Sequence, residues 1–250
     1  MRHMKFTKLD VTTADGTMDV YVHAPAGAGP FPTVILYPDA FGVRAAMHEV
    51  GERLAREGYL TVIVNTLYRA GKFAPFDIAN TFTNPPERAR IGAMMQKANG
   101  EAVMADTRSL LDVLAKEPRA KTDRFACCGY CMGGRLAFIA AGTFGERVAA
   151  AASFHPGNIV TDTPESPHLN ASKVRARLYF GIADNDSGCT PEAQAKLKAA
   201  LDAAKVRYEL EVYTGKLHGF AVTDFPPTIY DAGANKQHWE KLLGLLEEAL

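Results

Sequence analysis

The stretch that decides the fold is Arg124-Phe-Ala-Cys-Cys-Gly-Tyr-Cys-Met-Gly-Gly-Arg135. A short apolar run over residues 125–128 leads into a turn around Cys131, and a helix-forming run follows over residues 135–141. Strand, sharp turn and helix in this order are typical of a nucleophile elbow, whose usual form is G-x-S-x-G. The central residue here is a cysteine, so the pattern predicts Cys131 as the nucleophile.

The helix after the turn predicts how Cys131 is activated. Its free N–H groups and the positive end of its dipole point at the sulfur, which favours the thiolate form. The N–H group of Met132 is then free to bind an oxyanion. Cys127 and Cys128 fall in the strand, where a cysteine is usually a small buried apolar residue. A redox or zinc pair of Cys128 and Cys131 is an alternative, disfavoured because Cys128 lies in the strand.

Composition limits the class of protein. The chain has 250 residues, 28 basic and 28 acidic, so its total charge gives no indication of nucleic-acid binding or of binding to an anionic membrane. No apolar run approaches the roughly 20 residues that span a bilayer, and the N-terminus lacks the apolar core of a signal peptide. We therefore expect a cytoplasmic monomer or small homo-oligomer that acts on a small molecule. Neither a cofactor nor a metal is expected.

Apolar runs alternate with helical patterns along the chain. The expected strands are residues 6–13, 17–23, 33–37, 59–64, 125–128, 148–154, 177–182 and 207–213. The expected helices are residues 44–57, one from about residue 87, and residues 101–116, 135–141, 191–204 and 234–250. Residues 72–86 carry three prolines and predict a long surface loop, of the kind that often forms a lid or binding loop. This alternation predicts one α/β domain over residues 1–250, with a mainly parallel central sheet and helices on both faces.

Polar residues follow the expected strands, where such sheets collect their chemistry. They are Asp39, Cys131, His155, Asp184, Asp186 and His218. Nucleophile, acid and histidine in this chain order are typical of the α/β-hydrolase fold, and Cys131, Asp184 and His218 fit it. Asp186 is an alternative to Asp184, and His155 is an alternative base to His218.

Each residue of this triad then has a chemical role. Cys131 attacks an acyl carbon as a thiolate, and His218 exchanges protons with the thiol, the leaving group and water. Asp184 accepts a hydrogen bond from the other imidazole nitrogen and fixes its tautomer. The N–H groups of Met132 and Ala40 are expected to form the oxyanion hole.

The elbow resembles that of the dienelactone hydrolase (carboxymethylenebutenolidase) family. The resemblance continues through residues 39–43, 67–69, 181–184 and 218–221 and so covers nearly the whole chain. It implies a hydrolase with a Cys-His-Asp triad that opens an enol-lactone through a thioester acyl-enzyme. It also implies a role in activation for Asp39 and in substrate binding for Arg90. Phe41 and His155 are further candidates for substrate binding or activation.

Two positions depart from what the resemblance implies. Asp39 stands where the family carries a glutamate that contacts the resting cysteine. Val222 stands where the family carries an arginine for the substrate carboxylate, and Arg90 is a loosely aligned match for a second arginine. Arg90, Arg44 and Arg69 could equally be surface charges.

The nucleophile also limits the substrate. A thiolate is expelled readily from a tetrahedral intermediate, so the reaction goes forward only if the other leaving group is comparably good. This favours activated esters, enol-lactones or thioesters over amides. The competing hypotheses are a hydrolase-fold binding or thiol-redox protein without turnover and a cysteine peptidase.

Overall fold

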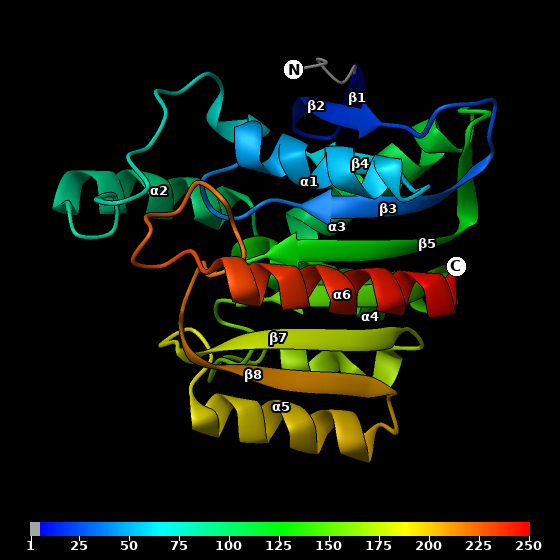
Figure 1. Ribbon diagram of the computed structural model, residues 1–250. Helices are drawn as coiled ribbons and strands as arrows, with labels where there is room; N and C mark the ends of the chain where they lie inside the picture. Colours follow the sequence, from blue (N-terminus) through cyan, green and yellow to red (C-terminus); the bar gives the residue numbers. More distant parts are fainter. Residues whose placement is uncertain (1–5) are drawn as a thin grey trace. The chain divides into compact units, whose positions relative to one another are not determined.

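The structure, a computed structural model, describes residues 6–250, which divide into two compact units at Phe125 and Ala126. The assignment of the whole chain to one domain stays a prediction. Figure 1 shows strands and helices alternating along both units, as the sequence predicts.

The strands of the first unit lie in the order β1–β2–β4–β3. β1 (Thr7–Thr13) and β2 (Gly16–His23) form the predicted antiparallel hairpin. β4 (Leu60–Val64) runs antiparallel to β2 and parallel to β3 (Phe31–Tyr37). All five residues of β4 are buried, as expected for an apolar strand covered on both faces.

The helices of the first unit cover both faces of these strands. α1 (Ala45–Arg56) packs against β2 and β4, and α3 (Gly100–Leu114) packs against β1. Figure 1 shows α1 in front of the strands and α3 behind them. α2 (Pro85–Lys97) begins with a proline. A proline is tolerated at the first helical position because an N–H group there would have no partner within the helix. A 3₁₀ turn, η1 (Tyr68–Ala70), precedes the irregular segment 72–84.

The strands of the second unit lie in the order β5–β6–β7–β8, where β5 (Ala120–Tyr130) begins before the boundary. β6 (Val148–Phe154), β7 (Arg177–Asn185) and β8 (Tyr208–Leu217) are parallel neighbours. α4 (Met132–Phe144) packs on β6, and α6 (Ala232–Ala249) packs on β6 and β7. Figure 1 shows α6 in front of these strands and α4 behind them. α5 (Pro191–Ala203) packs against η3 (Pro167–Lys173), and η2 (Gly145–Arg147) follows α4.

Three of these strands are longer than the sequence indicates. β5 was expected over residues 125–128 and covers Ala120–Tyr130. β7 was expected to end at residue 182 and runs to Asn185, with an irregularity in its pairing to β8 near Ala183. β8 was expected to end at residue 213 and runs to Leu217. These extensions change which side chains stand beyond the strand ends.

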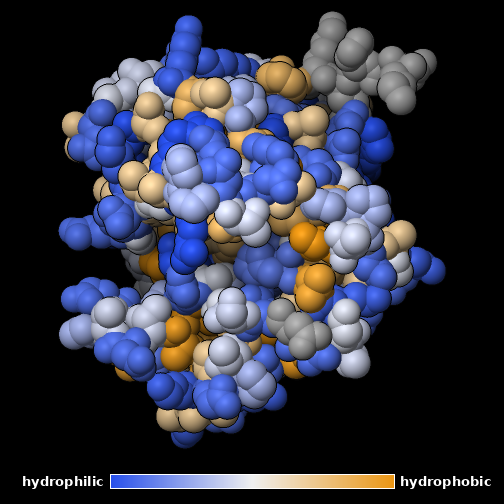
Figure 2. All heavy atoms as spheres, turned by 90° about the vertical axis from the view of Figure 1, so that its left-hand side faces the viewer, coloured by the Kyte–Doolittle hydropathy of each residue, from blue (hydrophilic) through white to orange (hydrophobic). Residues whose placement is uncertain are grey.

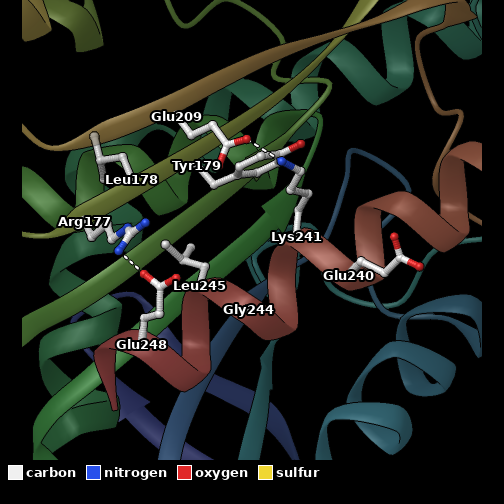
Figure 3. A pocket seen from close by; sticks show the side chains of 9 residues that line it. All are labelled: Arg177, Leu178, Tyr179, Glu209, Glu240, Lys241, Gly244, Leu245 and Glu248. Atoms are coloured by element: carbon white, nitrogen blue, oxygen red, sulfur yellow. Dashed lines mark hydrogen bonds and ion pairs between the residues drawn. The ribbon is translucent and has the colours of Figure 1, made fainter.

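The molecular surface carries small apolar groups and a cavity with charged lining residues. In the view of Figure 2, apolar side chains gather in small groups among polar ones. A cavity of about 210 Å³ lies between β7, β8 and α6. Four of its five charged residues pair with one another, Arg177 with Glu248 and Lys241 with Glu209 (Figure 3). Neither a cysteine nor a histidine lines it. Within residues 6–250, the helices are all too short or too polar to cross a membrane.

A buried ion pair stabilises the first unit. Arg69 donates from two nitrogens to both carboxylate oxygens of Asp106, at 2.7 and 2.8 Å, and the Tyr68 hydroxyl donates to the same carboxylate at 2.9 Å. Only 2% of the Asp106 side chain is exposed. The interpretation of Arg69 as a surface charge is therefore wrong.

We predict that Asp106→Asn lowers the free energy of unfolding by about 3 kcal/mol, because it takes the buried one of two counter-charges from a largely buried guanidinium. Asp15 is the matched control, since it binds the same arginine at 2.7 Å while 55% of its side chain is exposed. Asp15→Asn should cost less than about 1 kcal/mol. Urea unfolding of both variants measures the difference, and equal losses would contradict this account.

Candidate active site

Cys131 stands on a strained turn between β5 and α4. Its backbone angles are φ 54° and ψ −117°, in the left-handed range that costs a non-glycine residue about 1–3 kcal/mol. Its N–H donates to the Phe154 carbonyl at 3.0 Å, and its carbonyl accepts from Gly157 N–H at 3.3 Å. The predicted order of strand, sharp turn and helix is confirmed.

Close packing between α4 and β6 sustains this turn. A Cβ atom at Gly134 would lie 2.8 Å from Ser153 Oγ and 3.2 Å from the Gly129 carbonyl oxygen. Distances this short exclude a side chain, so only glycine lets the helix approach β6 here.

His218 connects Cys131 to a carboxylate. It follows the last residue of β8, and its Nδ1 lies 2.7 Å from Asp186 Oδ2. Its side chain also hydrogen-bonds with Cys131. The second carboxylate oxygen, Asp186 Oδ1, accepts from Gly188 N–H at 2.7 Å. Asp186 is 6% exposed, so its carboxylate is fixed from both sides.

The acid of this group is Asp186, and the prediction that Asp184 contacts His218 is wrong. Because β7 continues to Asn185, Asp184 lies inside the strand, where its exposed carboxylate accepts from Gly215 N–H at 3.0 Å. Asp186 is the first aspartate beyond the strand end. The carboxylate that contacts His218 is therefore two residues further along the chain than predicted.

The charge of the neighbouring groups favours a protonated His218. Burial lowers the pKa of His218. The electrostatic interaction with Cys131 and the hydrogen bonds with Asp186 and Cys131 outweigh burial and hold the pKa of His218 well above its ordinary value. A positively charged imidazole beside a thiolate sulfur is the arrangement that activates a cysteine.

His155, the alternative base, lies against His218 and not in its place. The two rings meet edge to face with their centroids 4.9 Å apart. His155 is fully buried, and neither ring nitrogen has a hydrogen-bond partner within residues 6–250. Burial and the charges of His218 and His238 lower the pKa of His155 well below its ordinary value, so the ring stays neutral. A substrate-binding role for His155 stays a prediction.

The other cysteines are buried and free. Cys127 and Cys128 are fully buried in β5, as expected, and burial raises the pKa of Cys128 to about 12. Burial and the charge of Asp186 raise the pKa of Cys189 to about 12 as well. Cys131 is the half-buried one. These environments leave Cys131 as the accessible thiol.

Asp39 and its neighbours in the first unit form a small polar cluster of their own. Arg44 donates to both oxygens of the buried Asp39 carboxylate, at 2.7 and 2.9 Å, and Phe41 N–H donates to the same carboxylate at 3.0 Å. Arg44 is thus not the surface charge considered above. Ala40 is buried in the same turn after β3.

Arg90 fastens the 72–84 segment to α2. Its guanidinium donates to Glu87 at 2.6 and 3.2 Å and to the Ala74 carbonyl at 3.0 Å, and it lies 3.7 Å from the centre of the Phe76 ring. These contacts give Arg90 a structural role, in which it holds the 72–84 segment against α2. Its predicted role in substrate binding stays a prediction.

The comparison with known proteins decides the family. The model described as "Dienelactone hydrolase family" matches residues 18–250. The chain belongs to the dienelactone hydrolase family. It is accordingly a hydrolase of carboxylic esters or lactones, as the sequence predicted.

Curated relatives of the chain belong to the same group. A Synechocystis protein named "Putative carboxymethylenebutenolidase" is 27% identical over 237 residues, which cover 92% of this chain and 91% of the relative. A Saccharomyces cerevisiae protein of the same name is 26% identical over 257 residues, which cover 96% of this chain and 88% of the relative.

Solved structures confirm the α/β-hydrolase fold. The "Putative Dienelactone Hydrolase" from Klebsiella pneumoniae has a TM-score of 0.81 at 23% identity, covering 96% of this chain and 97% of that one. An acylaminoacyl peptidase from Pyrococcus horikoshii has a TM-score of 0.71 at 15% identity and covers all of this chain and 42% of that one. At these identities the likeness shows the fold alone.

Two residues near Cys131 were missed by the sequence analysis. A Cβ atom at Gly157 would lie 3.9 Å from Cys131 Sγ, and a Cβ atom at Gly188 would lie 3.0 Å from Asp186 Oδ1. Their signal in the sequence was weak, because a glycine in a loop after a strand usually marks only a turn.

We predict that Cys131→Ala lowers the pKa of His218, since the electrostatic interaction with Cys131 is the strongest influence raising it. The wild-type ring should keep its proton above pH 6.5, the ordinary histidine pKa, and lose it as the pH rises through the raised value. In Cys131→Ala the ring should lose its proton at a lower pH than in wild type, while Asp186 still favours the charged form. NMR titration of the ring proton, assigned with His218→Gln, measures this, and superimposable titration curves would contradict it.

Proposed function

We propose that this chain hydrolyses activated carboxylic esters or enol-lactones through a thioester on Cys131. The observation that carries the proposal is the contact of His218 with Cys131 on one side and Asp186 on the other. The three residues come from three separate turns, each beyond the end of a strand. This is where α/β folds place their chemistry.

Acylation uses the charge already present at the site. The Cys131 thiolate attacks the carbonyl carbon, a C–S bond forms, and the carbonyl electrons move to oxygen. The intermediate collapses with cleavage of the bond to the leaving oxygen, which takes the proton from His218. Asp186 holds the imidazole in the orientation that directs the other nitrogen to this proton transfer.

Deacylation reverses the direction of proton transfer. His218, now neutral, accepts a proton from water as the water oxygen attacks the thioester carbon. The C–S bond then breaks, a carboxylic acid leaves, and the thiolate and imidazolium are restored. In each step the oxyanion needs donors, and the Met132 N–H at the start of α4 is suited to that role because it is one of the unpaired donors of a helix terminus. Ala40 as the second donor stays a prediction.

The leaving group sets the substrate class. An alkoxide leaves the tetrahedral intermediate less readily than the Cys131 thiolate does. Enolates, phenolates and other thiolates leave about as readily as the Cys131 thiolate. An enol-lactone fits this requirement and is consistent with relatives named carboxymethylenebutenolidases. Val222 is buried and apolar, so it offers no charge to a substrate carboxylate.

The thiol-redox alternative lacks a second reactive thiol. Cys128 is fully buried with a pKa of about 12, whereas redox pairs depend on accessible thiols with lowered pKa values. Cytoplasmic location and a monomeric or small oligomeric state stay predictions.

The proposal is tested by hydrolysis of p-nitrophenyl acetate and of a dienelactone by wild type, Cys131→Ala and His218→Ala. Both variants should lose at least about 1,000-fold in kcat, because the nucleophile and base act as a unit. Cleavage of the ester but not of the dienelactone would restrict the substrate class to activated esters. Activity that survives Cys131→Ala would overturn the mechanism.

The two aspartates give a matched pair of variants. We predict that Asp186→Asn lowers kcat at least about 100-fold, because an amide cannot stabilise the imidazolium and can favour the wrong tautomer. Asp184→Asn should change kcat less than about 3-fold, since the hydrogen bond that its carboxylate accepts within residues 6–250 comes from Gly215 N–H and not from His218. Steady-state kinetics at saturating ester measures both, and a larger effect at position 184 would reverse the assignment.

A further inference from the structure

The turn that follows β6 is fixed directly beside Cys131. It comprises residues 155–158, and two of them, His155 with φ 36° and Asn158 with φ 56°, adopt the left-handed conformation that non-glycine residues seldom take. Three backbone hydrogen bonds hold it: His155 N–H to Gly181 O at 2.7 Å, Gly157 N–H to Cys131 O at 3.3 Å, and Asn158 N–H to Gly188 O at 3.0 Å. The turn is therefore a rigid wall beside the sulfur.

Gly157 is the part of this wall that faces the reactive groups. A Cβ atom at this position would lie 3.9 Å from Cys131 Sγ and 4.0 Å from His218 Cε1. Apart from Gly157 itself and its two chain neighbours, no other atom of the described residues lies within 4 Å of that point. The open side of Gly157 thus points into a space bounded by the nucleophile and the base.

We propose that Gly157 determines acyl specificity, by leaving room at the sulfur for an acyl group larger than acetyl. The inference rests on the proposed function, because it concerns the thioester formed on Cys131. In that thioester the carbonyl carbon is bonded to Sγ, so the substituent on the carbonyl carbon lies within a few ångströms of the sulfur. A methyl group at position 157 would occupy part of the same space.

Backbone geometry does not require glycine at this position. The φ of Gly157 lies outside the left-handed range, and the contacts of an added Cβ would be ordinary van der Waals contacts. Alanine should therefore fold normally. Gly188 differs, because a Cβ atom there would lie 3.0 Å from Asp186 Oδ1 and 3.1 Å from the Gly157 Cα. Gly188 is explained by packing, whereas the space at Gly157 remains available to a ligand.

The test compares wild type with Gly157→Ala on p-nitrophenyl esters that share a leaving group and differ in the acyl group: acetate, isobutyrate and pivalate. We expect kcat/KM for acetate to change less than about 3-fold and kcat/KM for the branched esters to fall about 10-fold or more, the usual effect of one methyl group in a substrate pocket. Gly142→Ala on α4 is the matched control, since its Cβ would meet Asn170 and Lys173 at 3.6–3.9 Å. It should leave all three values unchanged.

A uniform loss on all three esters would overturn the proposal, because it would mean that the methyl group disturbs the cysteine and histidine themselves. That pattern is the one expected of Gly188→Ala, which pushes against the Asp186 carboxylate. Unchanged values for the branched esters would overturn the proposal as well.

A second readout does not depend on hydrolysis. Alkylation of Cys131 by iodoacetamide and by its bulkier N-phenyl derivative reports the room at the sulfur, because Cys127, Cys128 and Cys189 are buried. In Gly157→Ala the ratio of the bulky to the small reagent's rate should fall by about 10-fold, and an unchanged ratio would count against the proposal. If wild type cleaves no ester but the ratio falls, the proposed function fails while the space at Gly157 is real.

Discussion

The candidate site depends on one constraint, the left-handed backbone of Cys131. A chain that turns this sharply between a strand and a helix must be held from several sides, since the conformation is unfavourable for any residue with a side chain. The hydrogen bonds of Cys131 with Phe154 and Gly157 supply that support, and the close approach at Gly134 lets α4 pack tightly on β6. The same contacts bring the strained turn at 155–158 against the sulfur, so the nucleophile and its neighbouring wall are fixed together.

Electrostatic interactions then set the orientation and the charge of the His218 imidazole. Asp186 receives a backbone N–H on one oxygen and His218 on the other, so the carboxylate orients the imidazole without being free to move itself. The buried ring of His155 packs edge to face against His218. Because the pKa of His155 is lowered, this ring is neutral and does not repel the charged imidazole of His218. The arrangement keeps positive charge on His218, where it faces both Cys131 and Asp186.

The sequence predicted the elements whose signals are local. The apolar runs of β4 and β6, the hairpin of β1 and β2 and the elbow at Cys131 each depend on a few consecutive residues, and all lie where expected. The choice between Asp184 and Asp186 depended on where β7 ends, which is set by its pairing with β8 and has no local signal. The pairing of Arg69 with Asp106 was missed for the same reason, because it joins residues 37 positions apart. The role of Gly157 depends on an absent side chain, which no residue pattern can reveal.

The central claim is a covalent acyl group on Cys131. Rapid acid quenching during turnover of an activated ester, followed by peptide mass spectrometry with fragmentation across residues 124–135, measures it directly. The account predicts one acyl mass on the sulfur of Cys131, with none on Cys127 or Cys128 and none at all in Cys131→Ala. Turnover of the ester with the acyl group on another residue, or with no acylated peptide under conditions that preserve a thioester, would contradict it.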